Sequence, residues 1–111
     1  MPVFRDFEVE ALRWLLEPAL GKDSVDALIY EAEFVSYDYS GCGYFLSVTH
    51  PSLPQDRFVY SSPLVLGRAG GVESGFLIFV ENGELTLECC TLGEIEVPED
   101  FRDRNVHISA C

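Results

Sequence analysis

The strongest constraint in this sequence is one Asn-Gly pair between two apolar stretches, within the segment Gly75–Cys90. Asn-Gly is the preferred pair for a two-residue type I′ turn because both residues take positive φ there. A turn at Asn82-Gly83 fixes the register of a hairpin. One face receives the apolar pairs Val80 with Leu85, Ile78 with Leu87, and Phe76 with Cys89. The other face receives Phe79 with Thr86, Leu77 with Glu88, and Glu81 with Glu84. A slip by one residue would expose two leucines, so turn and pattern favour the same register.

A helix is predicted near the start of the chain, over Asp6–Glu17. Its apolar residues recur at spacings of three and four and form one stripe: Phe7, Ala11, Leu12, Leu15 and Leu16. Asp6 is the expected N-cap. Pro18 is expected to end or kink the helix at Glu17 because a proline disfavours helical geometry in the residue before it.

Short strands and turns follow. Apolar and polar residues alternate from Leu28, which predicts a strand with Leu28, Tyr30, Ala32 and Phe34 on one face, and a helical turn before it is left open. Pro63 is expected at a break or an edge position. The stretch Arg68–Ser74 is expected as a flexible loop and Pro98–Phe101 as a helical turn. The predicted strands are Leu28–Asp38, Tyr44–His50, Arg57–Tyr60, Leu64–Gly67, Glu94–Val97 and Val106–Ser109.

Together these elements predict a single α+β domain over residues 1–111. The N-terminal helix packs on one face of a meander-like antiparallel sheet, which is centred on the hairpin 76–81/84–90. A chain of 111 residues is long enough for one core and too short for two. The predicted core contains Phe7, Leu12, Leu15, Leu16, Tyr30, Phe34, Leu46, Val48, Phe76, Ile78, Val80, Leu85 and Leu87.

The charge of the chain narrows the classes of partner. There are 19 acidic residues against 7 Lys and Arg, which gives a formal net charge of −12. Nucleic acids and anionic membranes attract basic proteins, so both are disfavoured as partners. The charge favours a basic protein partner, high solubility, or both. Between Ala69 and Phe101 there is no Lys or Arg, and the acids there are Glu73, Glu81, Glu84, Glu88, Glu94, Glu96, Glu99 and Asp100.

The sequence predicts a cytoplasmic protein. Its N-terminus leads into a charged amphipathic pattern and not into the apolar region of a signal peptide. The longest strongly apolar run, Phe76–Val80, is too short to span a bilayer. We therefore expect free thiols, with no disulfide, at Cys42, Cys89, Cys90 and Cys111, and a redox role for any of them is left open.

No catalytic residue, metal site or cofactor is predicted. The stretch Gly67–Gly71 lacks the Gly-Lys-Ser/Thr ending of a phosphate-binding loop. The cysteines and histidines (Cys42, Cys89, Cys90, His50, His107) lack metal-ligand spacing, and the negative charge of the chain disfavours a thiolate nucleophile. The outward carboxylates are expected to form a solvated face and not a glycosidase pair: Glu31, Glu33, Glu84 and Glu88.

The charge pattern instead predicts a partner-binding surface on the outward side of the hairpin. Carboxylates speed the encounter with a basic protein, and apolar anchors hold the contact. The predicted surface residues are Leu77, Phe79, Glu81, Glu84 and Glu88, with Tyr37 and Tyr39 as further candidates. Three alternatives stay open: an acidic surface that serves solubility alone, a ligand-binding protein or enzyme with a pocket near Gly67–Gly75, and a homo-oligomer.

Three segments resemble a pattern found in small bacterial proteins without assigned activity: Gly75–Val80, Gly83–Cys89 and Val97–Arg102. In size and acidity the chain is also similar to immunity proteins, which neutralise cognate toxins. The resemblance implies a protein-binding role, and it assigns no functional residue.

Overall fold

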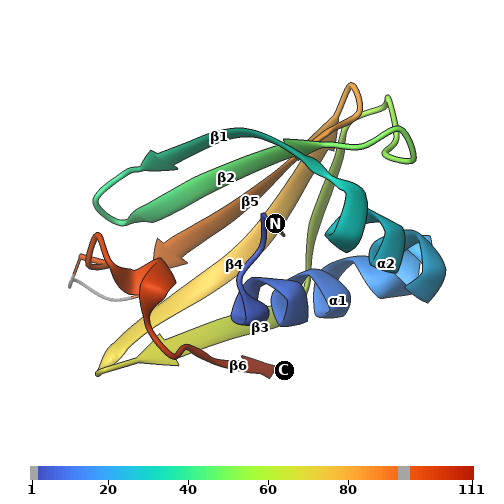
Figure 1. Ribbon diagram of the computed structural model, residues 1–111. Coiled ribbons are helices and arrows are strands. Elements are labelled where there is room, and N and C mark those ends of the chain that lie inside the picture. Colours follow the sequence, from blue (N-terminus) through green and yellow to red (C-terminus); the bar gives the residue numbers. More distant parts are fainter. Residues whose placement is uncertain (1–2, 93–95) are drawn as a thin grey trace.

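The computed structural model describes residues 3–92 and 96–111, which form two α-helices on one side of a six-stranded antiparallel sheet (Figure 1). The strand order is β1-β2-β5-β4-β3-β6. The predicted α+β class is thus confirmed. In chain order the elements are α1 (Asp6–Leu20), α2 (Lys22–Glu31), β1 (Glu33–Tyr39), β2 (Gly43–Thr49), β3 (Phe58–Ala69), β4 (Val72–Glu81), β5 (Glu84–Thr91), the 3₁₀ helix η1 (Phe101–Asp103) and β6 (His107–Ala110).

The central hairpin has the predicted register. Asn82 and Gly83 both have positive φ, 54° and 74°, as a type I′ turn requires. All six predicted cross-strand pairs between β4 and β5 are present, from Glu81 opposite Glu84 to Phe76 opposite Cys89. Burial alternates strictly along β4, so one face of the hairpin is covered and the other is not.

The glycine-rich stretch before the hairpin is a second tight turn, and the prediction of a loop over Arg68–Ser74 is wrong. Strand β3 continues to Ala69 and β4 begins at Val72. Gly70 and Gly71 both have positive φ, so two residues suffice to reverse the chain. The two predicted strands on either side of Pro63 are one strand, whose pairing with β4 is irregular between Tyr60 and Val65.

Helix α1 is longer than predicted and is capped differently. It continues through Pro18 to Leu20 and ends at Gly21, which has a φ of 84°. A proline removes one helical hydrogen bond and crowds the carbonyl four residues before it, and here both effects fall in the last turn, where the helix is about to end. The N-cap is Arg5 and not Asp6, because the Glu8 carboxylate accepts a hydrogen bond from the Arg5 N–H at 2.7 Å.

A second helix, α2, occupies the first part of the predicted strand Leu28–Asp38. Its buried residues, Val25, Leu28 and Ile29, have helical spacing. That stripe faces α1, so Tyr30 points to solvent and is 78% exposed. Phe34 lies on the helix side of the edge strand β1, but α1 covers β3, β4 and β6, and Phe34 is 56% exposed. The assignment of Tyr30 and Phe34 to the core was therefore wrong.

The C-terminal segment forms the edge strand next to β3. The predicted last strand is confirmed as β6, which pairs with β3. The predicted turn at Pro98–Phe101 leads directly into η1. Of the predicted strand Glu94–Val97, the first two residues lie outside the described part of the chain, and Glu96 and Val97 are not in a strand.

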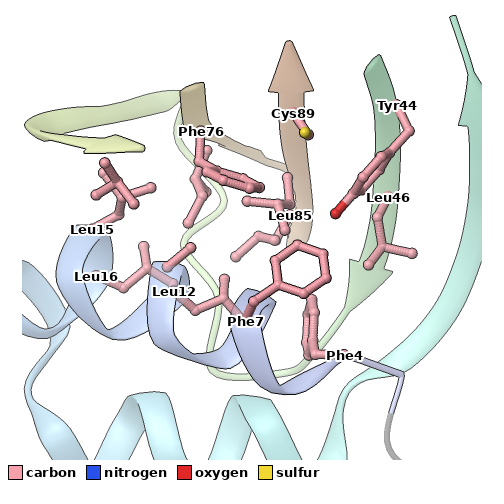
Figure 2. Packing of buried hydrophobic residues seen from close by; sticks show 14 of the residues in the cluster. Phe4, Phe7, Leu12, Leu15, Leu16, Tyr44, Leu46, Phe76, Leu85 and Cys89 are labelled. Atoms are coloured by element: carbon pink, nitrogen blue, oxygen red, sulfur yellow. The ribbon is translucent and has the colours of Figure 1, made fainter. Parts of the chain in front are cut away.

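The core lies between α1 and the covered face of the sheet. Figure 2 shows Phe7, Leu12 and Leu16 of α1 directed toward Phe76 and Leu85. The remaining predicted core residues are buried, and the core also contains residues that were not predicted: Phe4, Val25, Leu28, Ile29, Tyr44, Val65, Cys89, Val97 and Phe101.

The two faces of β4 make a stability prediction. Ile78 is fully buried, so Ile78→Ala should lower the free energy of unfolding by about 2–5 kcal/mol. Leu77→Ala, one residue away on the uncovered face, is the matched control and should lose clearly less. Chemical denaturation of both variants measures this, and equal losses would contradict the assignment of faces.

Candidate functional site

The uncovered face of the sheet is the candidate site and is called the open face. In antiparallel strands, residues directly opposite each other point to the same side. The register therefore places several rows of side chains on the open face, and the three nearest the Asn82-Gly83 turn contain the predicted surface residues. These three rows are Asp38, Phe45, Glu88 and Leu77; Ser36, Ser47, Thr86, Phe79 and Val59; and Glu33, Thr49, Glu84 and Glu81.

The carboxylates of the open face gather at the end with the Asn82-Gly83 turn. Glu81 and Glu84 lie directly opposite each other, with Glu33 in the same row. Within the described residues, the salt bridges include neither these three side chains nor Glu88. Near the other end of β4, by contrast, Glu73 is paired with Arg68. Negative charge at the turn end is thus left for solvent or a partner.

Apolar side chains run between these carboxylates. Leu77 and Phe79 are half-buried among their sheet neighbours, and Val59 beside Phe79 is 50% exposed. Glu88 stands between Phe45 and Leu77 in its row. The Ser47 and Thr86 hydroxyls, 2.8 Å apart, hydrogen-bond across the middle of the face. The open face therefore has an apolar band with an acidic margin.

The structure brings all five predicted surface residues together on this face. The further candidates Tyr37 and Tyr39 are not part of it. Tyr37 pairs with Leu46 and Tyr39 with Tyr44, both on the helix side. The Tyr39 hydroxyl donates to the Val97 carbonyl at 2.7 Å, so it serves packing at the edge of the core. The irregular register within β1, between Phe34 and Ser36, was not visible in the sequence.

A buried charged cluster on the covered face was missed by the sequence analysis. Glu8 is fully buried and accepts hydrogen bonds from Arg102 at 2.8 and 3.0 Å and from the Tyr44 hydroxyl at 2.5 Å. The Arg102 guanidinium also donates to the Val3 carbonyl and lies 5.6 Å from the ring centre of Tyr37. No local signal announces this pair, because 94 residues separate Glu8 from Arg102.

Burial and charge shape the ionisation of this cluster. Burial raises the pKa of Tyr44, and the Glu8 carboxylate raises it further, so the hydroxyl stays a donor. Burial alone would lower the pKa of Arg102, but the hydrogen bonds and charge of Glu8 outweigh it and raise that pKa. The cluster is a fully satisfied ion pair that joins α1, β2 and the segment after β5, and we assign it a structural role.

A second polar cluster has the residue types of a hydrolase triad. His50 Nε2 lies 2.9 Å from Glu31 and Nδ1 lies 2.6 Å from the Ser52 hydroxyl. The Ser52 backbone N–H also donates to Nδ1, at 3.1 Å. The backbone N–H groups of Asn82 and Gly83, on the neighbouring turn, are bonded to the Gln55 and Pro54 carbonyls and are not free to stabilise an oxyanion. The cluster therefore fits a structural role, in which hydrogen bonds to His50 hold the turn after β2 in place.

A surface hollow of about 510 Å³ lies beside the Gly70-Gly71 turn, where a ligand pocket was the alternative expectation. Its lining includes Arg68, Glu73 and His107. Arg68 is already paired with Glu73 across the strands. The hollow consequently offers a ligand little unpaired charge.

The cysteines divide between the two faces. Cys89 faces the core, and burial raises its pKa to about 12, so it is inert at neutral pH. Cys42 is exposed and Cys90 is half-buried, and their sulfur atoms are 3.4 Å apart. Within residues 3–92 and 96–111, no three His, Cys, Asp or Glu side chains are arranged to hold a metal ion.

No helix among the described residues has both the length and the apolar character needed to cross a membrane.

Comparison of the chain with protein-family models, with curated proteins and with solved structures finds no match.

The buried ion pair makes a testable prediction. Arg102→Met should lower the free energy of unfolding by about 3–5 kcal/mol, because it leaves the Glu8 carboxylate buried without its charge partner. The double variant Glu8→Gln/Arg102→Met should recover part of that loss. Chemical denaturation measures both, and a double variant less stable than Arg102→Met would contradict the account.

Proposed function

We propose that this protein is a small binding module that docks a basic protein on its open face, in the manner of an immunity or inhibitor protein. The observation that carries the proposal is the pair Glu81 and Glu84, two carboxylates directly opposite each other and outside every salt bridge of the described residues. Like charges in this position destabilise a sheet. The opposed carboxylates would lower the stability of the free protein. A basic partner would relieve their repulsion, so part of that stability would return on binding.

The apolar band supports protein binding over solubility alone. A solubility device needs charge but no anchor, whereas Leu77 and Phe79 interrupt the acidic margin with side chains suited to contact. The net charge of −12 favours rapid encounter with a basic protein. The expected compartment is the reducing cytoplasm. The hollow beside Gly70-Gly71 supports a ligand-binding role less well, because its arginine is already paired.

The repulsion itself can be measured without a partner. Glu84→Gln should raise the free energy of unfolding by about 0.5 kcal/mol, because it removes one charge of the opposed pair. Glu10→Gln, an exposed change on α1, is the control and should have little effect. A stabilisation that disappears in high salt would support the electrostatic origin, whereas a destabilised Glu84→Gln would contradict it.

The binding proposal is tested with three immobilised proteins of the same fold. These are wild type, the open-face variant Glu84→Gln/Glu88→Gln, and the control Glu10→Gln/Asp23→Asn. A cellular protein is studied further only if the control captures it and the open-face variant captures less of it. The control removes the same charge from the exposed helix surface. With that protein purified, Glu84→Gln/Glu88→Gln should slow association and flatten its salt dependence, and Phe79→Ala should speed dissociation. Equal association by both double variants would contradict the proposal.

A further inference from the structure

Two thiols from distant parts of the sequence meet on the open face of the sheet. The sulfur atoms of Cys42 and Cys90 are 3.4 Å apart, although 48 residues separate them in the chain. Cys42 immediately precedes β2, and Cys90 lies near the end of β5. Backbone bonds hold both, since Gly43 pairs with Cys90 and the Thr91 N–H donates to the Cys42 carbonyl at 2.7 Å.

Gly43 is what allows this approach. A Cβ atom at Gly43 would lie 1.6 Å from the Cys89 carbonyl oxygen, so any other residue would push the two strands apart. The backbone contact brings the residue before Gly43 toward the residue after Cys89, and those two residues are the cysteines. The backbone thus brings the two cysteines side by side, and their side chains place the sulfur atoms in contact.

The two thiols are chemically unequal. Cys42 is exposed, and hydrogen bonds from the Ser40 hydroxyl and from Cys90 lower its pKa. The same contact raises the pKa of Cys90, which keeps its proton and donates a hydrogen bond to the Cys42 sulfur. Cys42 is therefore the thiol that ionises first, and a neighbouring thiol is in place to react with it. Cys111 is also exposed but lies at the chain end, and Cys89 is buried.

We propose that Cys42 and Cys90 form an oxidation site, which a hydroperoxide converts into an intramolecular disulfide. The Cys42 thiolate attacks one oxygen of the peroxide, the O–O bond breaks, and Cys42 becomes a sulfenic acid while water or an alcohol leaves. The Cys90 thiol then attacks the Cys42 sulfur, and the S–O bond breaks with release of water. Two thiols lose two electrons and two protons in total, and the peroxide takes them up. The proposal is independent of the proposed binding function.

The test compares four proteins treated with hydrogen peroxide: wild type, Cys111→Ser, Cys42→Ser and Cys90→Ser. Remaining thiols are alkylated, and peptide mapping then locates any disulfide. Wild type and Cys111→Ser should each lose two thiols and remain monomers. Peptide mapping should find one disulfide-linked pair, Cys42 with Cys90, and dithiothreitol should restore both thiols. Cys90→Ser should stop at the sulfenic acid of Cys42, which dimedone traps. Cys42→Ser should lose its remaining thiols several-fold more slowly.

Two outcomes would overturn the proposal. In one, dimedone labels Cys42 equally in wild type and in Cys90→Ser, which would mean that Cys90 does not react with the sulfenic acid. In the other, the disulfides are intermolecular and disappear in Cys111→Ser. Circular dichroism of each serine variant before treatment shows whether it is folded. Ser40→Ala provides a fifth protein that keeps all four cysteines, and it should slow the first oxidation step because Cys42 loses a hydrogen bond.

Discussion

The alternation of side chains along the β4–β5 hairpin is the constraint on which the rest of the structure depends. The turn at Asn82-Gly83 allows one register, and this register turns Ile78 and Leu87 toward the helices. The same register turns Phe79 and Glu84 to the opposite side. The core and the open face are therefore two consequences of one turn, and the core needs no residue that the open face uses.

The buried ion pair of Glu8 and Arg102 helps to fix the position of α1 on the sheet. The hydrophobic effect that holds the stripe of α1 on the covered face is non-directional, whereas hydrogen bonds to a buried charge require particular partners at particular positions. Glu8 fixes the position of α1 because it is bonded to two groups outside the helix, the Tyr44 hydroxyl and the Arg102 guanidinium. Each lost bond would leave a buried charge short of a partner. Glu8 therefore sets where α1 lies on the sheet and draws the C-terminal segment to it.

Sequence reasoning succeeded where a signal is local and failed where it is not. The hairpin, its register and the side of the sheet on which Leu77, Phe79, Glu81, Glu84 and Glu88 lie follow from a period of two around a recognisable turn. Tyr30 and Phe34 were misplaced because a short helix followed by a strand can imitate one alternating strand, and only the position of α1 decides which side is covered. The pairing of Glu8 with Arg102 has no local signature at all, because the two residues lie near opposite ends of the chain and meet only in the tertiary structure.

The open face combines an opposed pair of carboxylates with apolar side chains. Carboxylates alone would keep the protein soluble, and they would do so better if Glu81 did not stand opposite Glu84. Glu88 lies between Phe45 and Leu77, where apolar neighbours take some of its water away. Like charges directly opposite each other are unfavourable in a sheet, and a basic group placed against Glu81 and Glu84 would reduce that repulsion.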